Sequence, residues 1–402
     1  MTRAYSLKFL IALLAVFLGI GLVNHIVDPY SIWGSPQIKG INTSKYLVFH
    51  ERIPAFVGWS KWTHPPETIL LGTSRTADGL RADHPAFQNS VTLNMALGGQ
   101  PAHETLLLFK HAVKSGKLKR AVIGLDFFAF NVYWAADSAS QEKRLTPGAN
   151  LDLLFNSSTL SDSLTTIRQS LPSLHVVNEA HGADNLPGQS DASPPAMPMR
   201  TLFKEVEKIY VDYFHPPPYR LYAHTLPDGS GNTLDDFREL LRLAHANNIE
   251  LHLLISPSHA WHWQTVADVG LWQEWEHWKR SLVAINAQES QRSGQPGYPL
   301  WDFTGYNSIT SETVPTAGSA NKMRWYSDSS HYNHACGDLI LSRVLSQPDP
   351  EGHIPADFGI LIDTGNIDEH LADIRQARAR YIDTHLTDTR ELTDFIKQFW
   401  NH

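Results

Sequence analysis

The chain has 402 residues, a formal charge of −8, 42% hydrophobic residues and only 18% charged residues. This length and apolar content are enough for one large or two small domains with a substantial core. The acidic excess and the lack of a basic stripe argue against a nucleic-acid partner. The one cysteine, Cys336, excludes an internal disulfide, and the pattern around it favours a buried thiol on a packed helix.

An almost wholly apolar run covers residues 9–27, interrupted only by glycines and one Asn-His pair. As a helix it spans roughly 28 Å at ~1.5 Å per residue, which is enough to cross a bilayer. Arg3 and Lys8 precede the run and Asp28 follows it, so the positive-inside rule places residues 1–8 in the cytoplasm. A cleaved secretory signal shares the charged start, but no Ala-x-Ala site follows the run. We therefore expect an uncleaved transmembrane signal anchor.

Residues 28–66 are rich in Trp, Pro and Gly and predict a connecting region without chemistry of its own. From residue 67, strand and helix patterns alternate up to residue 346. Strands are expected at 68–71, 91–94, 120–125, 249–255 and 300–303, and helices at 102–115, from Thr233 onward, at 272–288 and at 334–345. This alternation predicts an α/β domain, a three-layer α/β/α sandwich with a central, mostly parallel, flavodoxin-like sheet.

Two segments depart from this alternation. We expect an insertion at about 135–232, serving as a lid or a partner surface, because its proline-rich stretch 183–198 cannot bury a core. Residues 347–402 predict a C-terminal helical extension with an apolar stripe that includes Leu371.

The first strand of the domain ends in Gly72-Thr73-Ser74, a pattern typical of a strand-to-helix elbow that presents one hydroxyl above the sheet. Ser74 is the candidate nucleophile, and Arg75 beside it is a candidate substrate contact. A serine hydroxyl needs a base held by a carboxylate. Near the other end of the domain, Asp328 and His331 are three residues apart before the last helix, and this spacing lets the carboxylate reach the imidazole.

The order of a strand followed by Gly-x-Ser, then a late Asp-x-x-His, resembles the SGNH (GDSL-like) hydrolase superfamily. The resemblance covers short blocks between about residues 66 and 345. It implies that Ser74, Asp328 and His331 form a catalytic triad. The stretch from Asn94 to Gly98-Gly99 resembles the second block of the superfamily, which implies that the N–H groups of Ser74 and Gly99, with Gly98 and Asn94 nearby, bind the oxyanion.

The third block departs from the superfamily pattern. The superfamily commonly has Gly-x-Asn-Asp there, with the Asn side chain as a third oxyanion donor, whereas this chain has Gly124-Leu125-Asp126-Phe127. An ionised carboxylate cannot donate a hydrogen bond. Three alternatives stay open: Asp126 is protonated, Asn131 or Asn94 replaces it, or the oxyanion hole is weak. A weak hole favours a restricted transferase or a non-catalytic relative over a broad lipase.

Other polar residues follow predicted strands or flank the base. Asp126 and Asn131 follow the strand at 120–125, and His259 follows the strand at 249–255, so they are candidate substrate contacts at the carboxyl edge of the sheet. His259 could instead bind a metal together with His262. Tyr332, directly after His331, is a further candidate substrate contact.

An exported, membrane-anchored SGNH-like domain resembles accessory proteins of bacterial polysaccharide O-acetylation and teichoic acid D-alanylation. The resemblance implies acyl transfer or ester hydrolysis on an extracytoplasmic polysaccharide through an acyl-Ser74 intermediate. It also implies a bacterial inner-membrane location with a periplasmic domain and a multi-spanning membrane O-acyltransferase as partner. We expect no cofactor or metal. Two alternatives stay open. One is a catalytically degenerate glycan-binding scaffold. The other is a metal-dependent hydrolase, suggested by 21 histidines and the spacing of Asp328, His331 and His334.

Overall fold

The computed structural model describes residues 2–30, 33–43, 65–134, 151–171, 197–319, 321–347 and 354–400. The chain divides into two compact units, one formed by residues 1–64 with 139–196 and one by residues 65–138 with 197–402. Most of the expected connecting region and of the proline-rich stretch 183–198 lies outside the described residues.

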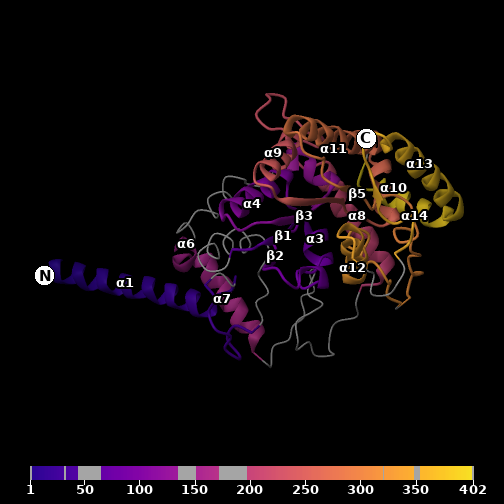
Figure 1. Ribbon diagram of the computed structural model, residues 1–402. Coiled ribbons are helices and arrows are strands. Elements are labelled where there is room, and N and C mark those ends of the chain that lie inside the picture. The colour runs from indigo at the N-terminus through magenta and orange to yellow at the C-terminus, as the bar shows by residue number, and fades with distance from the viewer. Residues whose placement is uncertain are drawn as a thin grey trace. The chain divides into compact units, whose positions relative to one another are not determined.

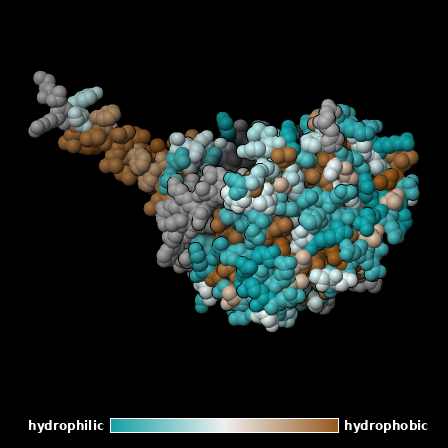
Figure 2. All heavy atoms as spheres, turned by 90° about the horizontal axis from the view of Figure 1, so that it is seen from above, coloured by the Kyte–Doolittle hydropathy of each residue, from teal (hydrophilic) through white to brown (hydrophobic). Residues whose placement is uncertain are grey.

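In its described residues, the first unit contains one long helix, α1 (Thr2–Val27), and two shorter helices, α6 (Leu151–Phe155) and α7 (Ser157–Ser170). Within α1, the stretch Tyr5–Val27 is long and apolar enough to cross a membrane. Figure 2 shows apolar side chains, coloured brown, along most of this helix. The helix therefore has the length and composition that the sequence predicts for an anchor.

The polar interruption near the end of α1 is a packing contact. The buried Asn24 donates from Nδ2 to the carbonyl oxygen of Leu154 at 2.8 Å and accepts a hydrogen bond from Ser163 Oγ at 2.9 Å. These bonds join α1 to α6 and α7, which also pack on it. A buried amide is tolerated here because its polar atoms have partners. The expected insertion at 135–232 thus contains packed helices.

The second unit contains a six-stranded sheet. Its strands are β1 (Thr68–Leu71), β2 (Thr92–Asn94), β3 (Arg120–Leu125), β4 (Glu250–Ile255), β5 (Leu300–Asp302) and β6 (Ile360–Leu361). The spatial order is β2-β1-β3-β4-β5-β6, with parallel pairing throughout except between β5 and β6. The first five strands follow the flavodoxin-like order. The predicted α/β class and mostly parallel sheet are confirmed, and the C-terminal extension also supplies an antiparallel edge strand.

Nine helices of the described chain accompany the sheet, besides short 3₁₀ turns at Pro85–Phe87, Phe127–Phe130 and Val132–Trp134. They are α3 (Ser74–Gly79), α4 (Ala102–Lys114), α8 (Met199–Phe214), α9 (Thr233–Ala246), α10 (Ala260–Asp268), α11 (Trp272–Ser293), α12 (His334–Val344), α13 (Ile367–Thr384) and α14 (Leu386–Ile396). In Figure 1, α4, α9 and α11 lie above the strands, and α3 and α12 lie below them. Pairwise packing joins α4 to α9, α9 to α11 and α3 to α12.

Helix α9 starts at Thr233, as the sequence predicts. The side chain that caps this helix belongs to Asn232, which accepts hydrogen bonds from the N–H groups of Leu234 and Asp235. Thr233 instead donates from Oγ1 to the carbonyl oxygen of Phe130 at 2.8 Å. Asn and Thr both favour cap positions, and here Asn232 caps the helix while Thr233 bonds to a distant segment.

The register of the sheet brings the candidate site residues to one edge. Leu71 at the end of β1 pairs with Ile123 of β3, so Ser74 and Asp126 both follow their strands at the carboxyl edge. In this strand order β1 and β3 are the neighbours between which the chain direction across the sheet reverses, and ligands of open α/β sheets bind at such a point.

Candidate active site

The segment after β1 forms a tight elbow that starts α3 at Ser74. Gly72 has a φ of +147°, and a Cβ there would lie 2.4 Å from Thr76 Oγ1, so the turn requires glycine. Thr73 caps the helix by accepting a hydrogen bond from the N–H of Arg75 at 3.3 Å. Ser74 thereby occupies the first helical position, half-buried at the end of a fully buried strand.

The predicted base lies against this serine. His331 Nε2 is 2.7 Å from Ser74 Oγ, and His331 Nδ1 is 2.8 Å from Asp328 Oδ2. The other carboxylate oxygen, Asp328 Oδ1, accepts hydrogen bonds from the backbone N–H groups of Ser330 and His331, at 2.7 and 2.8 Å. Ser74 and His331, which are 257 positions apart in the chain, therefore meet with Asp328 in one continuous hydrogen-bonded relay.

The electrostatics of this pair favour an imidazole oriented as a base. Burial alone raises the pKa of a carboxyl group, but for Asp328 the facing His331 and the backbone donors reverse this, and its pKa lies below the usual value. Burial alone lowers the pKa of an imidazole, but the Asp328 carboxylate outweighs it and raises the pKa of His331. An ionised Asp328 accepts a hydrogen bond from His331 Nδ1–H, so the lone pair of Nε2 faces the Ser74 hydroxyl.

The glycine loop after β2 lies beside the elbow. Leu97 donates from its N–H to the carbonyl oxygen of Gly72 at 3.1 Å, which holds the following Gly98 and Gly99 near the start of α3. Gly99 has a φ of +64°, and its N–H and that of Ser74 have no hydrogen-bond partner within the described part of the chain. These two N–H groups remain the best candidates for oxyanion donors.

Two asparagines expected as further donors are engaged elsewhere, which corrects the sequence prediction. Asn94 donates from Nδ2 to the carbonyl oxygens of Leu80 and Thr76, at 2.9 and 3.2 Å, and so fastens the end of α3. Asn131 donates from Nδ2 to the carbonyl oxygens of Phe214 and Leu221, both at 3.0 Å. Neither amide is available to an oxyanion or a substrate.

Arg75 and Asp126 are also not substrate contacts. Both side chains are 1% exposed, and Arg75 Nη1 lies 2.7 Å from Asp126 Oδ1. The hydroxyl of Thr73 donates to Asp126 Oδ2 at 2.6 Å. Both carboxylate oxygens of Asp126 are therefore engaged by Thr73 and Arg75, and this side chain does not face an oxyanion as a donor.

His259 and Tyr332 likewise turn inward. His259 is fully buried, caps α10 by accepting from the N–H of Trp261 at 3.2 Å, and lies 2.7 Å from the carbonyl oxygen of Glu312 through Nε2. Burial lowers its pKa to about 4, which keeps it neutral. Tyr332 is buried against Gly79, where any Cβ would overlap its ring. Their places at a strand end and beside the base predicted a site role, but packing determines both.

The residues suggested as a metal set are also committed elsewhere. Asp328 holds His331, and His334 Nδ1 faces the carbonyl oxygen of Gly79 at 3.4 Å. Over the described ranges, no three His, Cys, Asp or Glu side chains are grouped so that they could hold a metal ion. Among the described residues, Asp328, His331 and His334 therefore do not form a metal ligand set.

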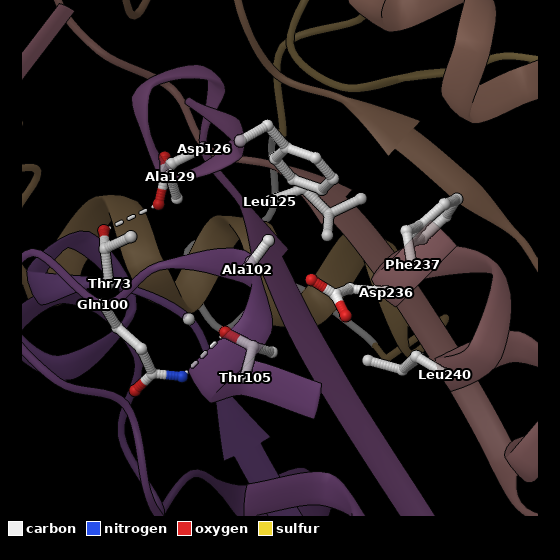
Figure 3. Close-up of a pocket in the computed structure, with 13 residues that line it drawn as sticks. Thr73, Gln100, Ala102, Thr105, Leu125, Asp126, Ala129, Asp236, Phe237 and Leu240 are labelled. Carbon is white, nitrogen blue, oxygen red and sulfur yellow. Dashed lines mark hydrogen bonds between the residues drawn. The ribbon is translucent and has the colours of Figure 1, made fainter. Parts of the chain in front are cut away.

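A small pocket opens next to the elbow (Figure 3). Thr73 and Asp126 lie on one side of it, joined by their hydrogen bond, and Phe237 and Leu240 of α9 lie on the other. Ser74 and His331 do not line it. The pocket therefore neighbours the relay without containing its reacting atoms.

Sequence reasoning missed several residues around the relay. Trp134 donates from Nε1 to the carbonyl oxygen of Gly99 at 2.7 Å, and Tyr213 packs on the Trp134 ring with centroids 4.2 Å apart. His262 and Ser330 contact Arg75 from two other parts of the chain. These contacts join segments that are distant in sequence, and no local motif marks them.

No family model matches the chain, and no curated protein is significantly similar to it.

Proposed function

We propose that this protein is a serine-dependent acyl transferase or esterase that works through an acyl-Ser74 intermediate. The observation that carries the proposal is the relay in which Ser74 Oγ lies 2.7 Å from His331 Nε2, and His331 Nδ1 lies 2.8 Å from Asp328. Serine nucleophiles are recognised by this geometry of hydroxyl, imidazole and carboxylate rather than by sequence position.

The reaction follows from the three groups. Ser74 Oγ bonds to the carbonyl carbon of an ester while His331 Nε2 takes the hydroxyl proton, and the N–H groups of Ser74 and Gly99 stabilise the oxyanion. When the intermediate collapses, the ester C–O bond breaks and His331 returns the proton to the leaving alcohol. Asp328 stabilises the imidazolium in between. A second alcohol or water then attacks the acyl-enzyme by the same steps in reverse, which gives transfer or hydrolysis.

The strand order and the flanking helices support a three-layer α/β/α sandwich of the SGNH type as the scaffold for this chemistry. In that resemblance, the glycine block after β2 supplies an oxyanion donor, as Gly99 does in this proposal. The chain departs from the pattern at Asp126, whose carboxylate accepts two hydrogen bonds. The proposed oxyanion hole therefore rests on backbone donors.

The proposed substrate is an O-acylated polysaccharide outside the cytoplasmic membrane. This part rests on the resemblance to bacterial cell-surface polymer modification proteins and on α1, which is long and apolar enough for a membrane anchor. With α1 spanning the inner membrane, the sheet unit works in the periplasm, where a multi-spanning O-acyltransferase is the proposed source of acyl groups. The basic residues before the apolar stretch favour this orientation.

A catalytically degenerate glycan-binding scaffold is the second candidate. One observation favours it: the side chains expected as a third oxyanion donor, Asp126, Asn131 and Asn94, are all engaged in other hydrogen bonds. Loss of one donor costs about 3–4 kcal/mol of transition-state stabilisation in serine hydrolases. In this alternative, glycan binding persists in Ser74→Ala, and the wild-type serine has no unusual reactivity.

The deciding experiment uses the full-length protein in detergent micelles with a fluorophosphonate probe, which reacts with activated serines. We expect one covalent adduct, located at Ser74 by peptide mass spectrometry. Ser74→Ala should show no adduct, and Ser158→Ala, which changes an exposed serine of α7, should react like the wild type. A folded wild-type protein that remains unlabelled would refute the enzymatic proposal and favour the scaffold.

A further inference from the structure

A buried guanidinium links the two halves of the relay. Arg75 directly follows Ser74 and is 1% exposed. Its Nε donates to Ser330 Oγ at 3.0 Å, and Ser330 directly precedes His331. One side chain therefore joins the residue after the nucleophile to the residue before the base.

The remaining contacts of Arg75 fix its orientation. Nη1 pairs with Asp126 at 2.7 Å, and Nη2 lies 3.0 Å from His262 Nε2. His262 Nδ1 in turn faces Glu207 Oε1 at 3.1 Å, which makes Nδ1 the donor and leaves Nε2 as an acceptor for Arg75. Burial keeps this imidazole neutral by lowering its pKa. The guanidinium is thus held by Asp126 after β3, by His262 on α10 and by Ser330 in the turn from Asp328 to His331.

The turn from Asp328 to His331 is also attached to helix α8, which lies beside the Arg75 guanidinium. Ser330 Oγ also contacts the hydroxyl of Tyr210 on α8, and Ser329 donates to the carbonyl oxygen of Phe203 at 3.3 Å. The Arg75 guanidinium lies 5.1 Å from the Tyr210 ring centroid, within cation–π range. Charge-assisted hydrogen bonds to a planar guanidinium are directional, so these partners fix the orientation of the buried Arg75 side chain.

We infer that Arg75, oriented by Asp126, is a positioning residue that holds the Asp328–His331 turn at hydrogen-bond distance from Ser74. The inference rests on the proposed function for its catalytic meaning. It also explains the departure in the third block: an acid occupies position 126 because an arginine follows the nucleophile, and a buried guanidinium needs a carboxylate partner. Arg75 touches no reacting atom and acts through the placement of His331.

The test separates positioning from stability. Removing Arg75 alone leaves Asp126 as an unpaired buried charge, which threatens folding. The double variant Arg75→Met/Asp126→Leu removes both charges and keeps the volume apolar, a replacement that buried ion pairs often tolerate. The matched control is Lys279→Met/Asp302→Leu, which removes another fully buried pair, at β5, separated from β1 by β3 and β4.

We expect the fluorophosphonate labelling rate of Arg75→Met/Asp126→Leu to fall about 10²-fold, since a misplacement near 1 Å costs about that much. With an aryl acetate, the loss should appear in kcat and leave KM unchanged.

Ser330→Ala should reproduce part of the loss. Arg75→Lys should recover only part of the rate, because one ammonium cannot reach Asp126, Ser330 and His262 together. The control should label at the wild-type rate per folded molecule.

A spectroscopic readout does not depend on turnover. In protein with ¹⁵N-labelled histidine, the Nδ1–H resonance of His331, assigned by its loss in His331→Ala, reports the hydrogen bond to Asp328. We expect this resonance to shift or broaden in Arg75→Met/Asp126→Leu and to persist in the control. If the wild type is not labelled at all but the resonance responds in this way, the proposed function fails and the positioning role stands.

Three outcomes overturn the inference. One is a folded Arg75→Met/Asp126→Leu protein with the wild-type labelling rate and an unchanged His331 resonance. Another is an equal loss of labelling and of the resonance in the Lys279→Met/Asp302→Leu control, which would indicate general loosening of the unit. The third is full recovery of the rate in Arg75→Lys, which would reduce the role of Arg75 to its charge.

Discussion

Two fully buried ion pairs of the sheet unit resemble each other in chemistry and differ in what they join. Arg75 and Asp126 lie 2.7 Å apart with 1% exposure, and Lys279 and Asp302 lie 2.6 Å apart with none. The first pair connects the elbow at Ser74 to the turn that carries His331. The second has no contact with either. Burial and charge are alike in the two pairs, so they do not distinguish them. Under the proposed function, the distinction comes from where each pair lies relative to Ser74 and His331.

The second pair fastens the far side of the sheet. Lys279 on α11 bonds Asp302 at the end of β5 and lies 3.7 Å from the Trp275 ring centroid. His370 on α13 contacts the same carboxylate at 2.8 Å. These contacts join two helices to the end of β5. We expect changes there to lower the free energy of unfolding and to leave the reactivity of Ser74 unchanged.

The largest expected difference between the two regions comes from His331→Ala. Without the imidazole, no group accepts the Ser74 proton, and removal of a triad histidine costs about 10⁶-fold in a serine hydrolase. Fluorophosphonate labelling should fall to the background seen with Ser74→Ala, while thermal unfolding stays near that of the wild type. If labelling survives this change, another residue is the base, and the proposed difference between the Arg75 region and the Lys279 region is wrong.

Asp328→Asn should have the next largest effect, about 10⁴-fold. The amide oxygen is needed by the backbone N–H groups of Ser330 and His331, so the amide NH₂ faces His331 Nδ1 and favours the wrong imidazole tautomer. The size of the amide matches that of the carboxylate, so the turn should remain folded. Single-turnover labelling kinetics with circular dichroism as a folding control measure this. A loss below tenfold would mean that the tautomer is set elsewhere.

Lys279→Met should produce the opposite signature. It leaves Asp302 as a buried carboxylate beside His370, and breaking a buried pair costs about 3–5 kcal/mol of unfolding free energy. Chemical denaturation measures the loss, and the labelling rate per folded molecule should equal that of the wild type. If labelling falls in parallel with stability, the two pairs do not differ in the way proposed.

The smallest expected effect is a shift in pH dependence. Labelling requires neutral His331, so the rate should rise with pH through the His331 pKa. The Asp328 carboxylate raises that pKa, which places the rising limb above the ordinary value near ~6.5. Asp328→Asn should move the limb to lower pH. Lys279→Met should leave it in place, and a limb that moves equally in both variants would contradict the assignment.

The elements of the sheet were largely predictable because their signals are local. Five of the strands are short apolar runs that end in turn residues, and the structure places them within one or two residues of the expected bounds. The helices α8 and α10 were not predicted. A capping histidine before α10 and prolines on both sides of α8 are weak sequence signals for a helix. Tertiary packing of the buried aromatic residues on each helix stabilises α8 and α10.

The sequence by itself determined the partners of the candidate relay, because the elbow and the Asp-x-x-His turn are each built by residues close together in the chain. Only the tertiary structure decided which other polar residues face the site. Arg75, Asp126, Asn94, Asn131, His259 and Tyr332 all have the chemistry and the chain position of site residues, and all are used in packing or in buried hydrogen bonds. A polar side chain can point toward a ligand or toward the core from the same strand end. Which direction it takes depends on buried partners that come from distant segments, and a local pattern does not contain them.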